Sequence, residues 1–194
     1  MNNNINGNNC NISLDSLIIK SLEEIEFIEK ELKKNEPILY KDKNLRLKLF
    51  YRMTKDDKEP QKFYEKCTRI VDNLILIKTN KGFRFGGISN SPWNDGIVTK
   101  DSKSFCFSID LKKIYNANEN SITHFTGGLP MFYGVCNGYD DQMIRIKYNK
   151  GVLFGKCGVK NNGSFQGQEK DYEINGGYCA FNILEWEAFE MIWV

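Results

Sequence analysis

From residue 38 to its end, the chain consists of short apolar runs separated by turns rich in glycine and asparagine. Residues 74–79 and 83–88 flank Asn80-Lys81-Gly82, a strong hairpin signal because glycine adopts positive φ without steric cost. Only residues 57–70 in this part carry helical spacing. Further strand-like runs occupy residues 45–49, 104–109, 131–135, 144–148, 152–155 and 183–192. This pattern predicts a mainly β fold with flanking helices, arranged as a two-sheet antiparallel β-sandwich.

An amphipathic helix is expected to precede the strands. The positions Leu14, Ile18, Ser21, Ile25, Ile28 and Leu32 recur at alternating steps of four and three, as in the seam of a short coiled coil. We therefore expect an amphipathic helix or short coiled coil over residues 13–36, capped by Ser13 and ended before Pro37. The apolar stripe does not say what covers it. It packs on the following domain, or it mediates self-association or partner docking through residues 14–32.

Composition narrows the function classes. Lys and Arg number 27 against 25 Asp and Glu, so no basic excess favours a nucleic-acid binder. Residues 1–12, dominated by asparagine, are expected to be a disordered leader without the features of a secretory signal. The sequence has no run of about 18 apolar residues, so we expect no membrane insertion. We expect a cytoplasmic protein with reduced cysteines.

Candidate catalytic residues are few. A Ser-His or Cys-His pair would have to use His124, the one histidine, and we expect no metal or cofactor. Glu185 and Glu187 share one face of the last predicted strand, where they form an acid/base pair, a solvated face, or acceptors for buried groups. Cys136 and Cys157 lie near glycines and are the candidate reactive thiols. Because none of these belongs to a complete catalytic motif, we expect a protein that is not an enzyme.

Four blocks in order resemble the TLDc domain family over roughly residues 45–192. The first is LFYRMTKD at 49–56 with Phe63 and Cys67 after it, and the second is LILIKT at 74–79 with FGG at 85–87. SFCFS at 104–108 and ILEWEAFE at 183–190 complete the set. The residues that carry the resemblance are Tyr51, Arg52, Phe63, Cys67, Phe85, Gly86, Gly87, Trp93, Ser104, Phe105, Phe107, Glu185, Glu187 and Phe189.

The resemblance implies a TLDc-like β-sandwich domain over residues 38–194 and a non-catalytic protein-binding module. Members of this family are associated with resistance to oxidative stress, and several bind the vacuolar proton-pumping ATPase (V-ATPase) and modulate its assembly or activity. A partner among the soluble subunits of that pump is therefore expected, with the protein reaching acidic-organelle membranes only through that partner.

Two surfaces are the expected partner contacts. One is the helix stripe and the other is a loop rich in Asn, Asp and Pro; the candidate residues are Ile18, Ile25, Ile28, Leu32, Trp93 and Asp95. Two alternatives remain open at this point: a small enzyme, either a thiol-dependent peroxide-handling protein or a hydrolase, and an adaptor that dimerises through its coiled coil.

Overall fold

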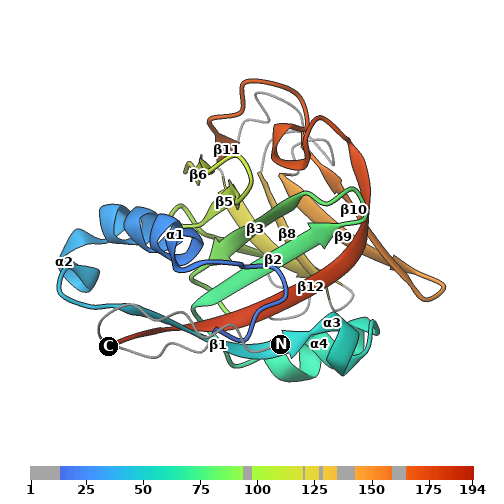
Figure 1. The fold of residues 1–194 in the computed structure, drawn as a ribbon, viewed down its shortest axis with the longest axis horizontal. Helices are drawn as coiled ribbons and strands as arrows, with labels where there is room; N and C mark the ends of the chain where they lie inside the picture. Colours follow the sequence, from blue (N-terminus) through green and yellow to red (C-terminus); the bar gives the residue numbers. More distant parts are fainter. Residues whose placement is uncertain (1–13, 94–97, 120, 127–128, 135–142, 159–164) are drawn as a thin grey trace.

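The computed structural model describes residues 14–93, 98–119, 121–126, 129–134, 143–158 and 165–194. Its long final strand, β12 (Ala180–Trp193), joins the two sheets of an antiparallel β-sandwich (Figure 1). Residues 180–182 pair with β10, and residues from 183 onward pair with β2 on one side and, from 187, with β1 on the other. The predicted mainly β fold with flanking helices is confirmed.

The first sheet, sheet A, has the order β11-β6-β5-β3-β2-β12, with β1 on the other edge of β12. Its strands besides β12 are β1 (Leu45–Arg52), β2 (Asn73–Thr79), β3 (Arg84–Ser89), β5 (Phe105–Ser108), β6 (Lys113–Ala117) and β11 (Phe165–Gln166). The second sheet, sheet B, has the order β12-β10-β9-β8-β7-β4. Its other strands are β4 (Val98–Lys100), β7 (Ser121–Thr126), β8 (Leu129–Gly134), β9 (Ile144–Asn149) and β10 (Val152–Cys157).

The predicted hairpin is present as β2 and β3. The Gly82 amide donates to the Thr79 carbonyl at 2.9 Å, and Gly82 has a φ of +90°, the conformation for which glycine is suited. The expected helix over 57–70 is shorter, α4 (Pro60–Cys67), and it begins with a proline at the first helical position. The sequence pattern did not predict β4, β6, β7 and β11, which are short and mix polar with apolar residues.

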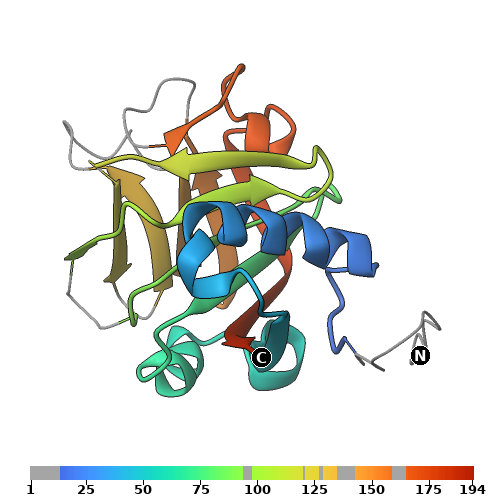
Figure 2. The ribbon, with the colours of Figure 1, turned by 90° about the vertical axis from the view of Figure 1, so that its left-hand side faces the viewer.

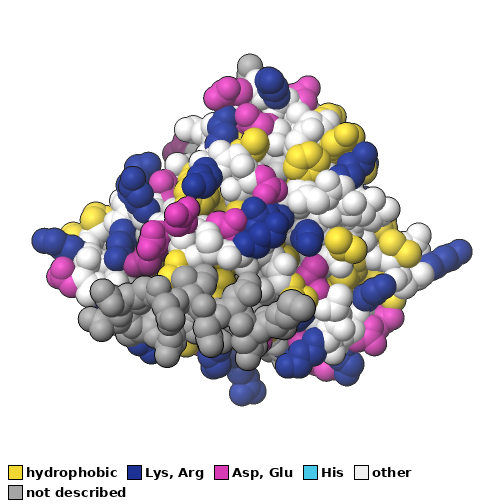
Figure 3. Space-filling model, in the orientation of Figure 1, with side chains coloured by type: hydrophobic (Ala, Val, Ile, Leu, Met, Phe, Trp, Pro, Cys, Tyr) yellow, Lys and Arg dark blue, Asp and Glu magenta, His cyan; other side chains and the backbone are white. Residues whose placement is uncertain are grey.

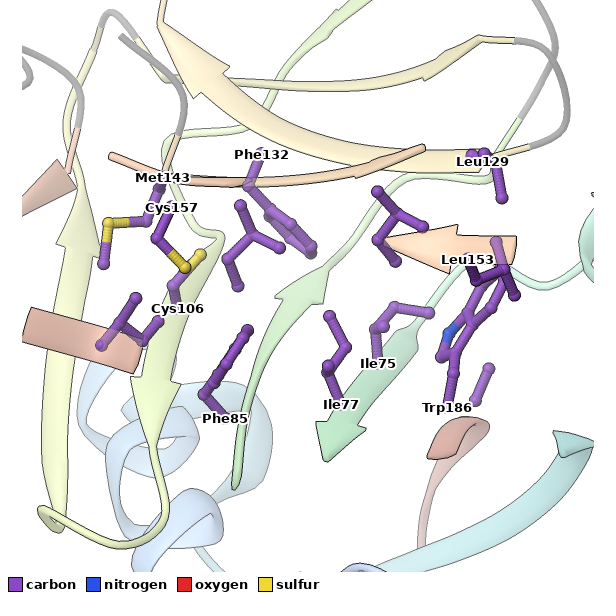
Figure 4. Close-up of a cluster of buried hydrophobic side chains, with 14 of the residues drawn as sticks. Ile75, Ile77, Phe85, Cys106, Leu129, Phe132, Met143, Leu153, Cys157 and Trp186 are labelled. Carbon is purple, nitrogen blue, oxygen red and sulfur yellow. The ribbon is translucent and has the colours of Figure 1, made fainter. Parts of the chain in front are cut away.

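Strand β2 of sheet A is buried on both faces. Leu74 and Leu76 of β2 lie in a cluster with helix α1 (Leu22–Asn35), whereas Ile75 and Ile77 lie in the cluster between the two sheets. Figure 2 shows α1 lying across sheet A, and Figure 4 shows the interior cluster. A strand covered on both sides carries no polar alternation. This explains the continuous LILI run of β2.

Helix α1 begins at Leu22, so the expectation of a helix from residue 13 was wrong for residues 14–21, the N-terminal segment, while Ser13 lies outside the described residues. The reason lies in Ser16, whose Oγ accepts the Ile18 and Ile19 amides at 3.1 and 2.9 Å. A side chain that satisfies nearby amides competes with the helical hydrogen bonds. The helix ends at Asn35, and the short α2 (Pro37–Tyr40) follows.

Gly87 of β3 lies directly against Phe132 of the opposite sheet. A Cβ atom at this position would lie 2.5 Å from Cζ of Phe132 in β8, which is closer than real Cβ contacts allow. Phe132 in turn packs edge-on against Trp93, with ring centroids 5.5 Å apart. The second glycine of the FGG block therefore makes room for an aromatic ring of the opposite sheet.

Candidate functional site

Glu187 is a fully buried carboxylate of β12 that joins the N-terminal segment to the sheet. Its oxygens accept hydrogen bonds from the Ser16 hydroxyl at 2.5 Å and from the Leu17 amide at 2.8 Å. The guanidinium of Arg52 in β1 donates Nε–H to the same carboxylate at 2.7 Å. All three donors belong to other segments of the chain, so Glu187 organises structure at this place.

Arg52 extends this network to Asp15. Its Nη2 lies 2.8 Å from the Asp15 carboxylate and also donates to the Asp15 carbonyl at 2.8 Å. Burial opposes the charge of Arg52, but the carboxylates of Glu187 and Asp15 outweigh burial and raise its pKa. The guanidinium is therefore a fixed cation that holds the N-terminal segment against β1 and β12.

Glu185 anchors a different element. It accepts the Thr54 hydroxyl at 2.6 Å and the Thr54 amide at 3.3 Å, both from the first turn of α3 (Met53–Asp56). The Trp186 amide adds a bond at 2.9 Å. Of the three uses considered from the sequence, the contacts of Glu185 and Glu187 are those of acceptors for buried donors. Their neighbours Trp186 and Ala188 lie in the cluster between the sheets.

A second buried arginine, Arg84 of β3, holds the far end of the N-terminal segment. Its Nη1 donates to the Ile18 carbonyl at 3.0 Å and lies 2.9 Å from the Glu24 carboxylate of α1. Its Nη2 pairs with Asp110 at 2.8 Å. Arg52 and Arg84 together thus attach residues 15 to 24 to sheet A.

The described thiols are buried or half-buried. Cys67, Cys106 and Cys157 are buried, and burial raises the pKa of all three, that of Cys67 to about 12. A raised pKa leaves little thiolate at neutral pH, the opposite of what a nucleophilic cysteine needs. Cys136, the other candidate thiol, lies outside the described residues, as does the side chain of His124 in β7.

The remaining motif residues serve packing. Tyr51, Phe63 and Trp186 form an aromatic group with ring centroids 4.3 to 5.1 Å apart. Cys67 and Phe85 lie in the same interior cluster, whereas Phe105, Phe107 and Phe189 face α1. The Ser104 hydroxyl donates to the Asp101 carbonyl at 2.6 Å. A Cβ on Gly86 would lie 2.1 Å from the Ile75 carbonyl oxygen, so this position also requires glycine.

The interpretation of Trp93 as an exposed partner contact was wrong. Its side chain is 2% exposed and lies in the interior cluster, because Phe132 of β8 supplies an aromatic surface that covers it. Its polar surroundings in the sequence suggested a loop tip, but the indole points into the sandwich. Asp95, the other candidate in this loop, lies outside the described residues.

The apolar stripe of α1 is not a free partner surface either. Ile18, Ile25, Ile28 and Leu32 are all buried in the cluster with sheet A, each 6% exposed or less. The stripe was expected either to pack on the domain or to mediate self-association or partner docking; in the structure it packs on the domain. The outer side of α1 carries charges of both signs, with Lys33 paired to Glu29 and Lys34 to Glu31 (Figure 3).

The outer face of sheet B carries a group of like charges, which we call the basic cluster: Arg145, Lys147 and Lys156. Ile144 and Ile146 of β9 and Leu153 of β10 point to the interior, so the alternate positions face outward. Lys156 lies directly opposite Arg145, and Lys147 lies opposite Phe154. Partial burial and the neighbouring charges of Arg145 and Lys156 lower the pKa of Lys147.

Sequence reasoning missed the two roles that the structure makes most evident. Arg84 interrupts the apolar run FRFGG, and a charge inside such a run is a signal that its partner is buried with it. The basic cluster follows from alternation in RIKYN at 145–149 combined with KC at 156–157, but only strand pairing brings Lys156 beside Arg145.

Metal clusters and membrane-spanning helices are both absent from the described part of the chain. No group of three or more His, Cys, Asp or Glu side chains within it could hold a metal ion. None of its helices has the length and apolar character needed to cross a membrane.

The chain matches the model of a known protein family. The family model of the TLDc domain matches residues 14–192, and no curated protein matches the chain. The match begins well before residue 45, so it includes the N-terminal segment and α1. This extent agrees with the contacts of Glu187, Arg52 and Arg84, which attach the N-terminal segment and α1 to the sandwich. The chain belongs to the TLDc domain family.

Proposed function

We propose that this protein is a non-catalytic binding module that binds the soluble sector of the V-ATPase and modulates its assembly or activity. Through the pump it contributes to resistance to oxidative stress, and it acts in the cytoplasm, reaching acidic-organelle membranes only through this partner. Membership in the TLDc family supports the class of partner. The engagement of Glu185 and Glu187 in structural hydrogen bonds supports binding over catalysis.

The observation that carries the proposal is the basic cluster. Lys147 and Lys156 lie on this outer face together with Arg145, and partial burial with the charges of Arg145 and Lys156 disfavours the charged form of Lys147. An acidic surface placed over the cluster would instead favour the charged form of Lys147. The cluster therefore fits a partner subunit with an acidic face, and Phe154 between the cations offers apolar contact area.

A binding module changes a pump through differential affinity. If the basic cluster binds the detached soluble sector more tightly than the assembled pump, binding shifts the equilibrium toward disassembly, and the reverse preference favours assembly. Neither outcome requires a chemical step by this chain.

The test is binding of the full chain to the purified soluble sector of the V-ATPase, measured by biolayer interferometry. The variant K147E/K156E should bind about tenfold more weakly than the wild-type chain, because both charges are reversed at the contact. The control K30E/K41E changes the net charge by the same amount at exposed positions on α1 and beyond α2. It should bind within about twofold of the wild type.

Two outcomes would contradict the proposal. Equal loss in both variants would show that net charge, rather than the basic cluster, determines binding. Absence of binding by the folded wild-type chain would remove the V-ATPase as partner.

A further inference from the structure

Two free thiols face each other where the ladder between β10 and β12 ends. The paired positions are Phe154 with Asn182, Gly155 with Phe181 and Lys156 with Ala180. One step further, Cys157 lies opposite Cys179, and the Cys157 amide donates to the Cys179 carbonyl at 2.8 Å. Directly opposed residues of an antiparallel pair project to the same face of the sheet. Both cysteines are free thiols in the structure.

The expected spacing permits a disulfide. Hydrogen-bonded antiparallel pairs have Cα atoms about 5.5 Å apart, and disulfides are most common at about 5.5–6 Å. Cys179 itself precedes the first residue of β12 and is half-buried.

We propose that Cys157 and Cys179 form an oxidisable pair that closes to an intramolecular disulfide when a peroxide is present. This goes beyond the binding function, because it assigns a modification site. The half-buried Cys179 is the entry point. Its thiolate attacks one peroxide oxygen, an S–O bond forms, the O–O bond breaks, and hydroxide leaves and takes up a proton as water.

The second step joins the two sulfurs. The Cys157 sulfur attacks the sulfenic sulfur of Cys179, the S–S bond forms, and the S–O bond breaks with loss of water. Two thiols and one hydrogen peroxide thus give one disulfide and two waters; sulfur is oxidised and peroxide is reduced. Burial and the neighbouring Cys179 raise the pKa of Cys157, so Cys157 is suited to the second step, where proximity compensates for scarce thiolate.

A third thiol offers a competing product. Figure 4 shows Cys106 of β5 beside Cys157 in the interior cluster, where both side chains are buried. A peroxide would have to enter the core to reach either of them first. Because Cys179 is half-buried and Cys106 is buried, access of the peroxide favours the link between Cys157 and Cys179 over the link between Cys106 and Cys157.

The experiment treats the reduced full chain with about ten equivalents of hydrogen peroxide and blocks the remaining thiols. Trypsin digestion without reductant is followed by mass spectrometry. Cleavage after Lys156, Lys160 and Lys170 places the two cysteines on separate peptides, residues 157–160 and 171–194. We expect these two peptides to be linked, with a mass two hydrogen atoms below their sum, and to separate with dithiothreitol.

Matched variants decide between the products. Cys106→Ala should retain the link, whereas Cys179→Ser, at a half-buried position, should lose it. A parallel oxidation in 8 M urea, where the chain is unfolded, should give mixed pairs instead of this one. The proposal is overturned if the folded wild type links residues 104–112 to 157–160, or if Cys179 proceeds to sulfinic acid with no link to Cys157.

Discussion

Charged residues inside the fold act as structural ties between segments that are far apart in sequence. Glu187 accepts hydrogen bonds from the N-terminal segment and from β1, and Arg84 donates to the Ile18 carbonyl and pairs with the Glu24 carboxylate. A buried ion pair is costly to break because the charge that remains is buried without a partner and without water to solvate it. Glu185 and Glu187 are therefore expected to contribute to the stability of the fold.

Replacing Glu187 with Gln should destabilise the protein by about 3 kcal/mol, since Arg52 loses its buried carboxylate partner. Urea unfolding measures this change in the free energy of unfolding. The matched control is Glu190→Gln in the same strand, whose pair with Lys48 is exposed and should contribute less than about 1 kcal/mol. Similar losses in the two variants would contradict the structural role assigned to Glu187.

Asp56 gives a prediction of pH dependence. Burial raises its pKa, but Lys66 and the Arg52 amide outweigh burial, and the net result is a pKa below the ordinary value of 3.8. A carboxyl with a lowered folded pKa stabilises the fold above its unfolded pKa, and this contribution is lost as the pH falls through the folded pKa.

Asp56→Asn should therefore cost about 1 kcal/mol at neutral pH, and the difference from wild type should shrink as the pH falls below 3.8. Thermal unfolding at a series of pH values measures the difference. Lys66→Gln should raise the pKa of Asp56 in a carboxyl-carbon NMR titration. A stability difference that stays constant down to acid pH would refute this account.

At the scale of elements, α1 is an integral layer of the domain. Its buried face covers Leu74, Leu76 and Ile88 of sheet A, which would otherwise lie in water. A fully buried isoleucine contributes about 1.5–3 kcal/mol through the area it removes from water. The family match, which starts at residue 14, treats this helix as part of the same unit.

Ile28→Ala should thus lower the free energy of unfolding by about 3 kcal/mol, through lost contacts and the cavity left behind. The molecular mass in solution should stay unchanged, because the stripe packs on the chain's own sheet. Light scattering measures the mass and urea unfolding the stability. Glu26→Ala on the exposed side of α1 serves as the control; a change of mass with Ile28→Ala would instead indicate self-association through the helix.

At the scale of the whole molecule, β12 couples the two sheets. Its beginning pairs with β10 in sheet B, and its remainder lies between β2 and β1 in sheet A. Trp186 of β12 and Trp93 both lie in the cluster between the sheets. Neither sheet keeps its full set of hydrogen bonds if the other unfolds, so loss of one should bring loss of the other.

The described domain should therefore unfold in one transition. Tryptophan fluorescence and far-ultraviolet circular dichroism should give the same urea midpoint. Phe181→Leu, where β10 pairs with β12, should lower both midpoints together. The expected loss in the free energy of unfolding is about 1 kcal/mol. Two separated midpoints would show that the sheets unfold independently.

Sequence patterns were most informative where structure is local. The hairpin at residues 74–88 was predicted because glycine in its turn and apolar runs on both sides are short-range signals. The helix boundary at residue 13 was wrong because Ser16 accepts the Ile18 and Ile19 amides and because Glu187 of the last strand holds Ser16 and Leu17. The contribution of so distant a residue as Glu187 leaves no local signal.

The amino-acid sequence by itself determined the mainly β fold, the amphipathic stripe of α1 and the family to which the chain belongs. Only the tertiary structure decided what covers the stripe, where Trp93 points, and that Cys157 meets Cys179. Periodicity marks which side of an element is apolar, and this property is local. The hydrophobic effect has no direction, so the surface that covers an apolar side depends on how distant segments pack.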